Sequence, residues 1–181
     1  MTGHNPAEIV AFWREAGPER CFAKDDAFDE AIRSRFLGEY EAAAAGRRDD
    51  WRHSADGSFA LLLLLDQFPR NLFRGSQRAF ATDAAALSVA EDAIAHGFDR
   101  AFPVPERRFF YTPHMHAEDL AQQERCIALC AASDDEEGVK YAVIHRDIIR
   151  DFGRFPHRNQ ILGRETTQQE QAFLDAGGFS G

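Results

Sequence analysis

Apolar residues along the chain recur at every third or fourth position, and they do not alternate over any useful length. The clearest case begins at Asp25, after which Phe28, Ile32, Phe36 and Tyr40 follow one another at every fourth residue. This spacing places the four side chains on one face of a helix. The pattern therefore predicts an all-α protein.

Local start and stop signals divide the chain into helices. An asparagine cap with a proline in the first turn predicts a start at Asn5-Pro6, and a capping box predicts another at Thr167–Glu170. The segment from Phe59 to Leu65 is apolar on all sides and is expected to be a central, buried helix. The expected helices cover residues 5–17, 25–46, 58–65, 82–97, 112–132, 141–152 and 167–177, with caps at Ser58 and at Thr82 or Asp83, and stops at Gly17-Pro18, Gly97 and Gly153.

The connections between these helices are short and polar, and we take Ser133–Gly138 as a solvated acidic turn. Several helices joined in this way predict antiparallel helical hairpins in one compact domain, residues 1–181. A chain of 181 residues is long enough to bury a core of its own.

Charge and composition exclude several classes of protein. The net charge is −9, from 21 Lys and Arg against 30 Asp and Glu, which argues against binding to nucleic acid or to an acidic membrane surface. No apolar run is long enough to span a membrane, and residues 1–8 lack the pattern of a signal peptide. The three cysteines are expected to be reduced thiols, with Cys126 and Cys130 in the core. We expect a soluble cytoplasmic protein.

A polar phrase occurs twice and is the most informative feature of the sequence. Residues 66–75 read DQFPRNLFRG, and residues 153–164 read GRFPHRNQILGR. Both contain Phe-Pro, then Arg-Asn, an apolar pair, and a glycine beside an arginine. The repetition indicates two helix-turn units built alike, each placing arginines just after a helix C-terminus, where carbonyl groups attract cations.

These arginines support two interpretations. In the first, they tie loops to helix ends, and Asp66 beside Gln67 is a structural carboxylate paired with Arg70 or Arg74. In the second, the guanidinium groups converge around a cleft and clamp a carboxylate or phosphate, which their planar geometry matches. The expected ligand-binding residues are then Arg70, Asn71, Arg74, Tyr111, Arg154, Arg158, Asn159 and Arg164.

The candidates for acid–base catalysis are His145, His116 and Glu118. His145 falls on the apolar stripe of its helix, where Asp151 could orient it. On one long helix, His114 and Glu118 would lie on the same face. Their spacing matches no known metal signature, so no metal and no other cofactor is predicted. The nucleophile, P-loop and dinucleotide motifs are absent from the sequence.

Taken together, the motifs resemble those of the bacterial domain-of-unknown-function family 924, which is placed in the tetratricopeptide-like superfamily. The matching segments are Val10–Trp13, Phe28-Asp29, Trp51, Leu64–Asn71, Arg74-Gly75, Phe80–Asp83, Phe109–Tyr111, Pro113, Met115–Asp119, Gln123, His145–Ile149, Phe152–Asn159, Leu162–Arg164, Thr167 and Glu170. They span essentially the whole chain; His114 departs from the aromatic residue expected there, and the stretch before the acidic turn is shortened. The resemblance implies an all-helical, tetratricopeptide-like right-handed array and no established activity.

Three functions follow from the sequence as alternatives. The first is a binding module whose pocket, lined by Arg, Asn and His, holds a small anionic ligand or an acidic peptide end. The second is a small hydrolase with a His/Glu general base and arginines that stabilise an oxyanion. The third is an interaction scaffold without a cleft, whose arginines are buried against Asp66, Asp147 and Asp151. No nucleic-acid or membrane partner is expected, and the oligomeric state is not predicted.

Overall fold

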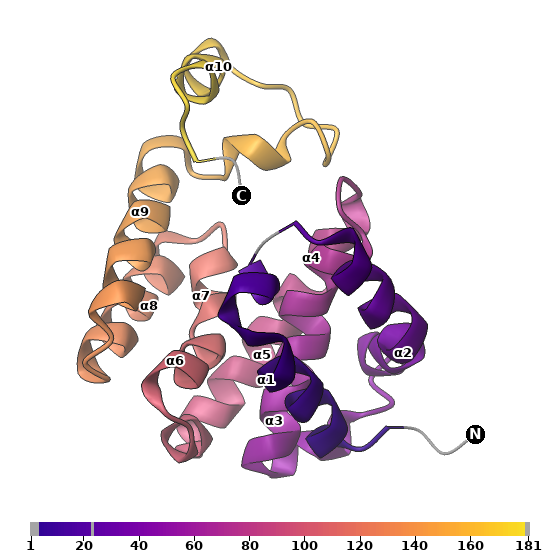
Figure 1. The fold of residues 1–181 in the computed structure, drawn as a ribbon. Coiled ribbons are helices and arrows are strands. Elements are labelled where there is room, and N and C mark those ends of the chain that lie inside the picture. The colour runs from indigo at the N-terminus through magenta and orange to yellow at the C-terminus, as the bar shows by residue number, and fades with distance from the viewer. Residues whose placement is uncertain (1–3, 23, 180–181) are drawn as a thin grey trace.

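All of the secondary structure in the described part of the chain is helical (Figure 1), which confirms the prediction of an all-α fold. The computed structural model describes residues 4–22 and 24–179, with the backbone only at residues 18, 19, 21 and 22. The α-helices are α1 (Pro6–Phe22), α2 (Asp26–Ala44), α3 (Ala55–Leu62), α4 (Phe68–Leu72), α5 (Asp83–Ala95), α6 (Val104–Arg107), α7 (Thr112–His116), α8 (Leu120–Ala132), α9 (Glu136–Phe152) and α10 (Gln168–Asp175). Short 3-10 segments connect them, namely η1 (Asp49–His53), η3 (Gln77–Phe80), η4 (Phe98–Ala101), η5 (Arg108–Phe110) and η6 (Pro156–Arg158), and a π-helical stretch, η2 (Leu63–Gln67), joins α3 to α4.

Several predicted helix ends are confirmed. Asp25 caps α2 through its carboxylate, which accepts a hydrogen bond from the backbone N–H of Phe28 at 3.0 Å. Thr167 and Glu170 form the predicted capping box at the start of α10. Gly153 ends α9 in the left-handed conformation, with a φ of 70° that glycine adopts without strain.

Two predicted boundaries near the N-terminus are shifted. Gly17 interrupts α1 with a φ of 74°, as its stop signal indicated, but helical turns resume beyond it and continue to residue 22. The cap of α3 is Ser54 rather than Ser58, because the Ser54 hydroxyl accepts from Gly57 N–H at 3.2 Å. The hydroxyl of Ser58 instead donates to the carbonyl of Arg52 at 3.3 Å, so Ser58 lies inside the helix.

The prediction of one long helix over residues 112–132 is wrong. The chain leaves the helical conformation at Ala117, whose ψ is 134°, and re-enters it at Leu120. Asp119 causes the restart, because its carboxylate caps α8 by accepting from Gln122 N–H at 3.0 Å. His114 and Glu118 therefore do not share a helix face.

The acidic turn before α9 is also not the solvated turn that was expected. Asp135 caps α9 and is only 4% exposed. The guanidinium group of Arg108 binds both of its carboxylate oxygens, at 2.7 and 2.6 Å. This carboxylate is buried because it is paired, so the charge pattern of the turn was misleading.

The segment from Phe59 to Leu65 lies at the centre of the core, as predicted, and none of its residues is more than 2% exposed. Helices α1, α2 and α5 surround it, while α8 and α9 form an antiparallel hairpin at one side (Figure 1). The tetratricopeptide-like arrangement stays a prediction. In the part of the chain that the structure describes, no helix is long and apolar enough to cross a membrane.

The central helix runs through the first polar phrase instead of ending before it. Pro69 lacks the N–H that would bond the carbonyl of Leu65, and the hydroxyl of Thr82 donates to that carbonyl at 2.6 Å. The π-helical stretch η2 accommodates the same proline, and the helix continues as α4. Arg70 is thus inside a helical turn, whereas Arg158 in the second phrase lies in the 3-10 segment η6, so the expectation of two similar turns after helix ends is wrong.

The C-terminal segment, from Gly153 onward, crosses over the end of α9 toward the side of the molecule that holds α4 (Figure 1). Together with the last turns of α9 it forms a small apolar cluster, which is separate from the main core. The members of this cluster are Ile148, Ile149, Phe152, Phe155, Phe173 and Phe179.

Candidate functional site

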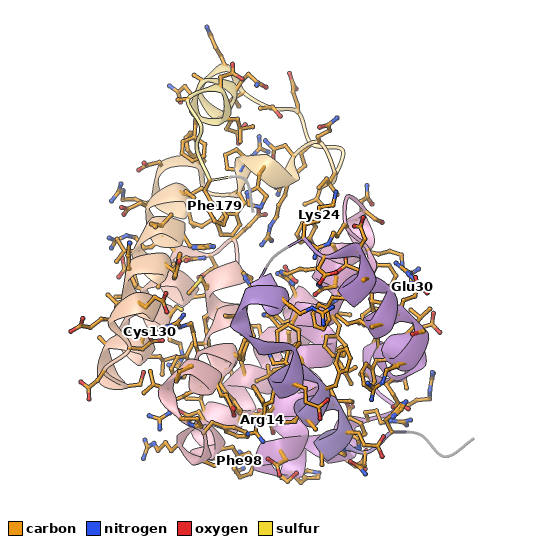
Figure 2. All side chains as sticks on the ribbon, viewed as in Figure 1. Arg14, Lys24, Glu30, Phe98, Cys130 and Phe179 are labelled. Atoms are coloured by element: carbon orange, nitrogen blue, oxygen red, sulfur yellow. The ribbon has the colours of Figure 1, made fainter. Side chains whose placement is uncertain are left out.

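An open pocket of about 320 Å³ lies between the C-terminal segment and the α4–η3 region. Residues from both polar phrases line it, together with histidines from α7 and α9. Figure 2 shows side chains beneath the C-terminal segment, where Phe179 is labelled. The lining residues are Arg70, Arg74, Gly75, Ala79, Phe80, His116, His145, Phe155, His157, Arg158, Ile161 and Phe179.

One arginine from each polar phrase meets the other on the pocket wall. Arg70 Nη2 lies 3.1 Å from Asp83 Oδ1, and Arg158 Nη1 lies 3.3 Å from Asp83 Oδ2. Both guanidinium groups also lie over the ring of Phe80, at 5.9 Å and 4.5 Å from its centroid. Burial raises the pKa of Asp83 although Arg70 and Arg158 favour its ionised form. Burial lowers the pKa of Arg158 to about 10.

A second carboxylate, Asp66, continues this arrangement into the protein. Its side chain is completely buried; Oδ1 accepts from His116 Nδ1 at 2.7 Å and lies 3.3 Å from Arg70 Nη1. Oδ2 accepts from the hydroxyl of Thr112 at 3.0 Å and from Gln67 Nε2 at 2.5 Å. Burial alone would raise the pKa of Asp66, but its interactions with His116, Arg70 and Thr112 hold it well below the usual value.

Three histidine rings face the pocket. The rings of His116 and His145 are 6.4 Å apart, and Phe179 packs against both His145 and His157, at 4.6 and 5.4 Å. Burial lowers the pKa of all three, that of His157 to about 4, with Arg158 next to His157 adding to the effect. The histidines are therefore neutral in the folded protein at pH 7.

These buried neutral histidines predict a loss of stability in mild acid. Their pKa values are lowered on folding, so below pH 6.5 the unfolded chain binds more protons than the folded one, and stability falls as the pH drops toward 4. Each such histidine contributes up to about 1.4 kcal/mol per pH unit within its window. Urea unfolding between pH 7.5 and 5 measures this slope.

A substitution shows how much of this pH dependence comes from one histidine. His157→Gln removes one titrating group and is expected to flatten the dependence by up to one proton. His96→Gln, at the exposed end of α5, serves as the matched control for a histidine-to-glutamine change outside the pocket. A stability that is constant over this range, or that rises on acidification, would contradict the burial of the histidines as neutral groups.

Most of the other expected ligand-binding residues are engaged elsewhere. The amide of Asn71 donates to Asp29 Oδ1 at 2.8 Å. Arg74 lines the pocket, and its Nη2 also binds Asp29, at 3.0 Å. The hydroxyl of Tyr111 donates to buried Asp99 at 2.8 Å, which with burial raises the pKa of Tyr111.

The remaining candidates hold the C-terminal segment together. Arg154 binds Glu170 at 2.6 and 2.9 Å, and Asn159 is fully buried, with its amide 3.5 Å from Thr166 Oγ1. Arg164 donates to the Glu118 carboxylate through Nη1 and Nη2, at 2.6 and 2.9 Å.

Glu118 is therefore not placed beside His116 or His145 as a catalytic partner. Besides binding Arg164, its carboxylate accepts from the backbone N–H of Phe155 at 2.8 Å. The Arg164 hydrogen bond and that of Phe155 lower the pKa of Glu118 against the effect of burial. The carboxylate next to His116 is instead Asp66, which the sequence had assigned only a structural role.

Several other expected contacts do not form. His145 Nδ1 bonds the carbonyl of Tyr141 at 2.8 Å, while Asp151 and Asp147 both bind Arg150, on the exposed side of α9. These carboxylates therefore do not enclose the matched arginines, as the scaffold alternative required. His114 Nδ1 bonds Gln122 at 2.7 Å. By contrast, Cys126 and Cys130 are free cysteines buried in the core, as predicted.

Sequence reasoning missed Phe80, His157, Ile161 and Phe179 as lining residues of the pocket, and Asp83 as the partner of two arginines that line it. His157 and Ile161 carried a signal, since both lie within the second polar phrase. Asp83 was recognised only as a possible helix cap, and its role as the shared partner of Arg70 and Arg158 depends on contacts across the fold.

The fold and the site define an all-α domain with an open pocket walled by arginine, histidine and phenylalanine. The chain belongs to the family described as "Bacterial protein of unknown function (DUF924)", whose model matches residues 9–178. It is similar to a solved structure described as "Structure of Protein of Unknown Function ATU0120 from Agrobacterium tumefaciens", with 48% identity, coverage of 95% of this chain and 97% of that chain, and a TM-score of 0.92. No curated protein matches this chain.

Proposed function

We propose that the protein binds a small organic acid in this pocket, with the apolar part of the ligand against the phenylalanines and its carboxylate or phosphate at the arginines. The observation that carries the proposal is the meeting of Arg70 and Arg158 at Asp83 on the wall of an open pocket. A volume of about 320 Å³ falls in the range of small-molecule sites.

Behind the pocket wall, alternating carboxylate and guanidinium groups continue from the neutral His116 in a chain, His116–Asp66–Arg70–Asp83–Arg158, in which each member contacts the next. Arg70 pairs with both Asp66 and Asp83, so Arg158 shares its carboxylate partner, Asp83, with Arg70. Arg158 Nη1 donates to Asp83. Its Nη2 has no hydrogen bond to any residue that the structure describes, and this nitrogen is accessible to solvent. An anionic oxygen is the partner that such a donor favours.

Apolar side chains also line the pocket. Phe80, Phe155, Phe179 and Ile161 line it, and Arg158 lies 4.6 Å above the ring of Phe155 as well as above Phe80. A ligand with an aromatic or branched apolar body would gain from burial against these side chains. The combination of an apolar body and one anionic group is what separates this ligand class from simple anions.

Calorimetric titration of the full chain with benzoate, phenyl phosphate and benzamide tests the proposal. Benzoate or phenyl phosphate should bind at least tenfold more tightly than neutral benzamide, which corresponds to about 1.4 kcal/mol. Arg158→Gln should remove that preference, whereas Arg150→Gln, on the exposed side of α9, should not. Equal binding of benzamide and benzoate, or no binding of either acid at millimolar concentration, would overturn the proposal.

An acidic peptide end, the other ligand class that the sequence suggested, would use the same contacts, since a peptide C-terminus is also a carboxylate next to an apolar side chain. Titration with N-acetylphenylalanine and its amide extends the comparison to that ligand class. Binding of the acid in preference to benzoate would favour the peptide end, and the reverse order would favour a free organic acid.

A further inference from the structure

His116 and Asp66 form a pair whose geometry goes beyond ligand binding. Asp66 is fully buried in the π-helical stretch η2, and its carboxylate orients the imidazole through a 2.7 Å hydrogen bond to Nδ1. Thr112 and Gln67 donate to the other carboxylate oxygen and so fix the carboxylate itself. An orienting carboxylate with its own hydrogen bonds is the support that a histidine base requires.

The hydrogen bonds also define the tautomer of His116. An ionised carboxylate can only accept, so the proton sits on Nδ1 and the lone pair sits on Nε2. Nε2 has no hydrogen-bond partner among residues 4–22 and 24–179, and it is not sealed from solvent. Because His116 lines the pocket, this lone pair is available to a molecule bound there.

We propose that His116 is a general base that activates water for the hydrolysis of a carboxylic ester held in the pocket, with Asp66 as its positioning residue. The inference rests on the proposed binding of small organic acids, which are the products of such a reaction. Water would add to the acyl carbon while Nε2 of His116 takes its proton. The bond to the leaving alcohol then breaks, and the same proton passes from Nε2 to the leaving oxygen, so that one ester and one water give one acid and one alcohol.

The alternating chain supplies the charge that this reaction needs. Arg70 contacts the same oxygen of Asp66 that holds His116, so the base and a guanidinium group are near neighbours. Arg158 is linked to Arg70 because both guanidinium groups contact Asp83. Among the described residues, Nη2 of Arg158 has no hydrogen-bond acceptor. Arg70, which shares Asp66 Oδ1 with His116, and Arg158, the next guanidinium group in the chain, are the donors that we assign to the oxyanion of the tetrahedral intermediate.

The protonation state of His116 also suits a base. Burial and Arg70 lower its pKa, against the opposing effects of Asp66 and Asp83, so the ring is neutral at pH 7. The titratable and charged groups that face the ring are Asp66, Arg70, Asp83, His145 and His157. A neutral imidazole beside cationic donors accepts a proton from water and retains a driving force to return it.

Hydrolysis of 4-nitrophenyl acetate and 4-nitrophenyl benzoate by the purified full chain tests this inference. His116→Gln is expected to lower kcat/KM by at least 100-fold, and calorimetry should show that it still binds benzoate as the parent protein does. His96→Gln provides the matched control and should hydrolyse both esters at the parent rate. No hydrolysis by the parent protein, or equal hydrolysis by His116→Gln, would overturn the inference.

Asp66→Asn tests the positioning role through the pH profile. Its amide can donate to Nδ1 and so favour the wrong tautomer, which should lower kcat with little change in KM. Loss of the negative charge should also move the acid limb of the profile to lower pH. An unshifted profile with a parent kcat contradicts the role of Asp66. If benzoate binds but no ester is cleaved, only the base is refuted; if benzoate does not bind, the proposed function fails as well.

Discussion

Replacement of Asp66 by alanine is expected to lower the free energy of unfolding by about 3–5 kcal/mol at pH 7. The carboxylate is fully buried and is the partner of Arg70, His116, Thr112 and Gln67. Its removal leaves the Arg70 guanidinium partly uncompensated and leaves several buried donors without an acceptor, which is the costly way to break a buried pair. Urea unfolding followed by circular dichroism measures the loss.

An exposed ion pair provides the matched control. Asp92 binds Arg52 at 2.6 Å, but the Asp92 side chain is 55% exposed, so Asp92→Ala is expected to cost no more than about 1 kcal/mol. The difference between the two variants should also depend on pH. The pKa of Asp66 is lowered on folding, so its contribution is complete above the unfolded value near 4 and is lost as the pH falls further. Equal losses in both variants would mean that the burial of Asp66 does not matter.

Local signals in the sequence predicted the helices well where a boundary depends on one or two residues. The Asp25 cap, the Thr167–Glu170 capping box and the stop at Gly153 all lie where they were expected. Each of these signals acts through a hydrogen bond or a backbone conformation within four residues, so it survives in almost any tertiary context.

The sequence-based predictions were wrong where a helix boundary or the burial of a charge depends on a residue far away in the chain. The first polar phrase was expected to follow the end of a helix, but Thr82 satisfies the carbonyl that Pro69 leaves free, and the helix continues. Asp135 was taken as solvated, but Arg108 pairs with it inside the protein. Neither Thr82 nor Arg108 can be recognised as a partner from its own sequence neighbourhood, because only the packed fold brings it into contact.

The candidate site shows the same division. The repeated phrase identified Arg70 and Arg158 as residues that would lie together, and in the structure both contact Asp83. Their shared partner Asp83 and the orienting carboxylate of His116 could not be predicted, since a carboxylate becomes a positioning group only through its neighbours in space. Patterns in sequence identify which residues take part, and contacts across the fold decide what each one does.

Truncation of Phe68 to alanine is expected to lower the free energy of unfolding by about 3–5 kcal/mol, because the ring is fully buried in the main core. Phe12 and Trp13 of α1 and Phe36 of α2 surround it, with ring centroids 6.4, 5.8 and 5.6 Å away, so both helices lose contacts and a cavity remains. The neighbouring Pro69 limits how far the backbone can relax into that cavity. Urea unfolding at pH 7 measures the change.

Leu120→Ala serves as the comparison, since Leu120 is 45% exposed at the start of α8 and its truncation should cost less than about 1 kcal/mol. Phe68→Ala should also weaken binding of benzoate more than Leu120→Ala does, because Phe68 lies two residues before Arg70 in the helical turn that carries it. If Phe68→Ala is no more destabilising than Leu120→Ala, the aromatic cluster around Phe68 is not what holds α4, and with it the pocket wall, against α1 and α2.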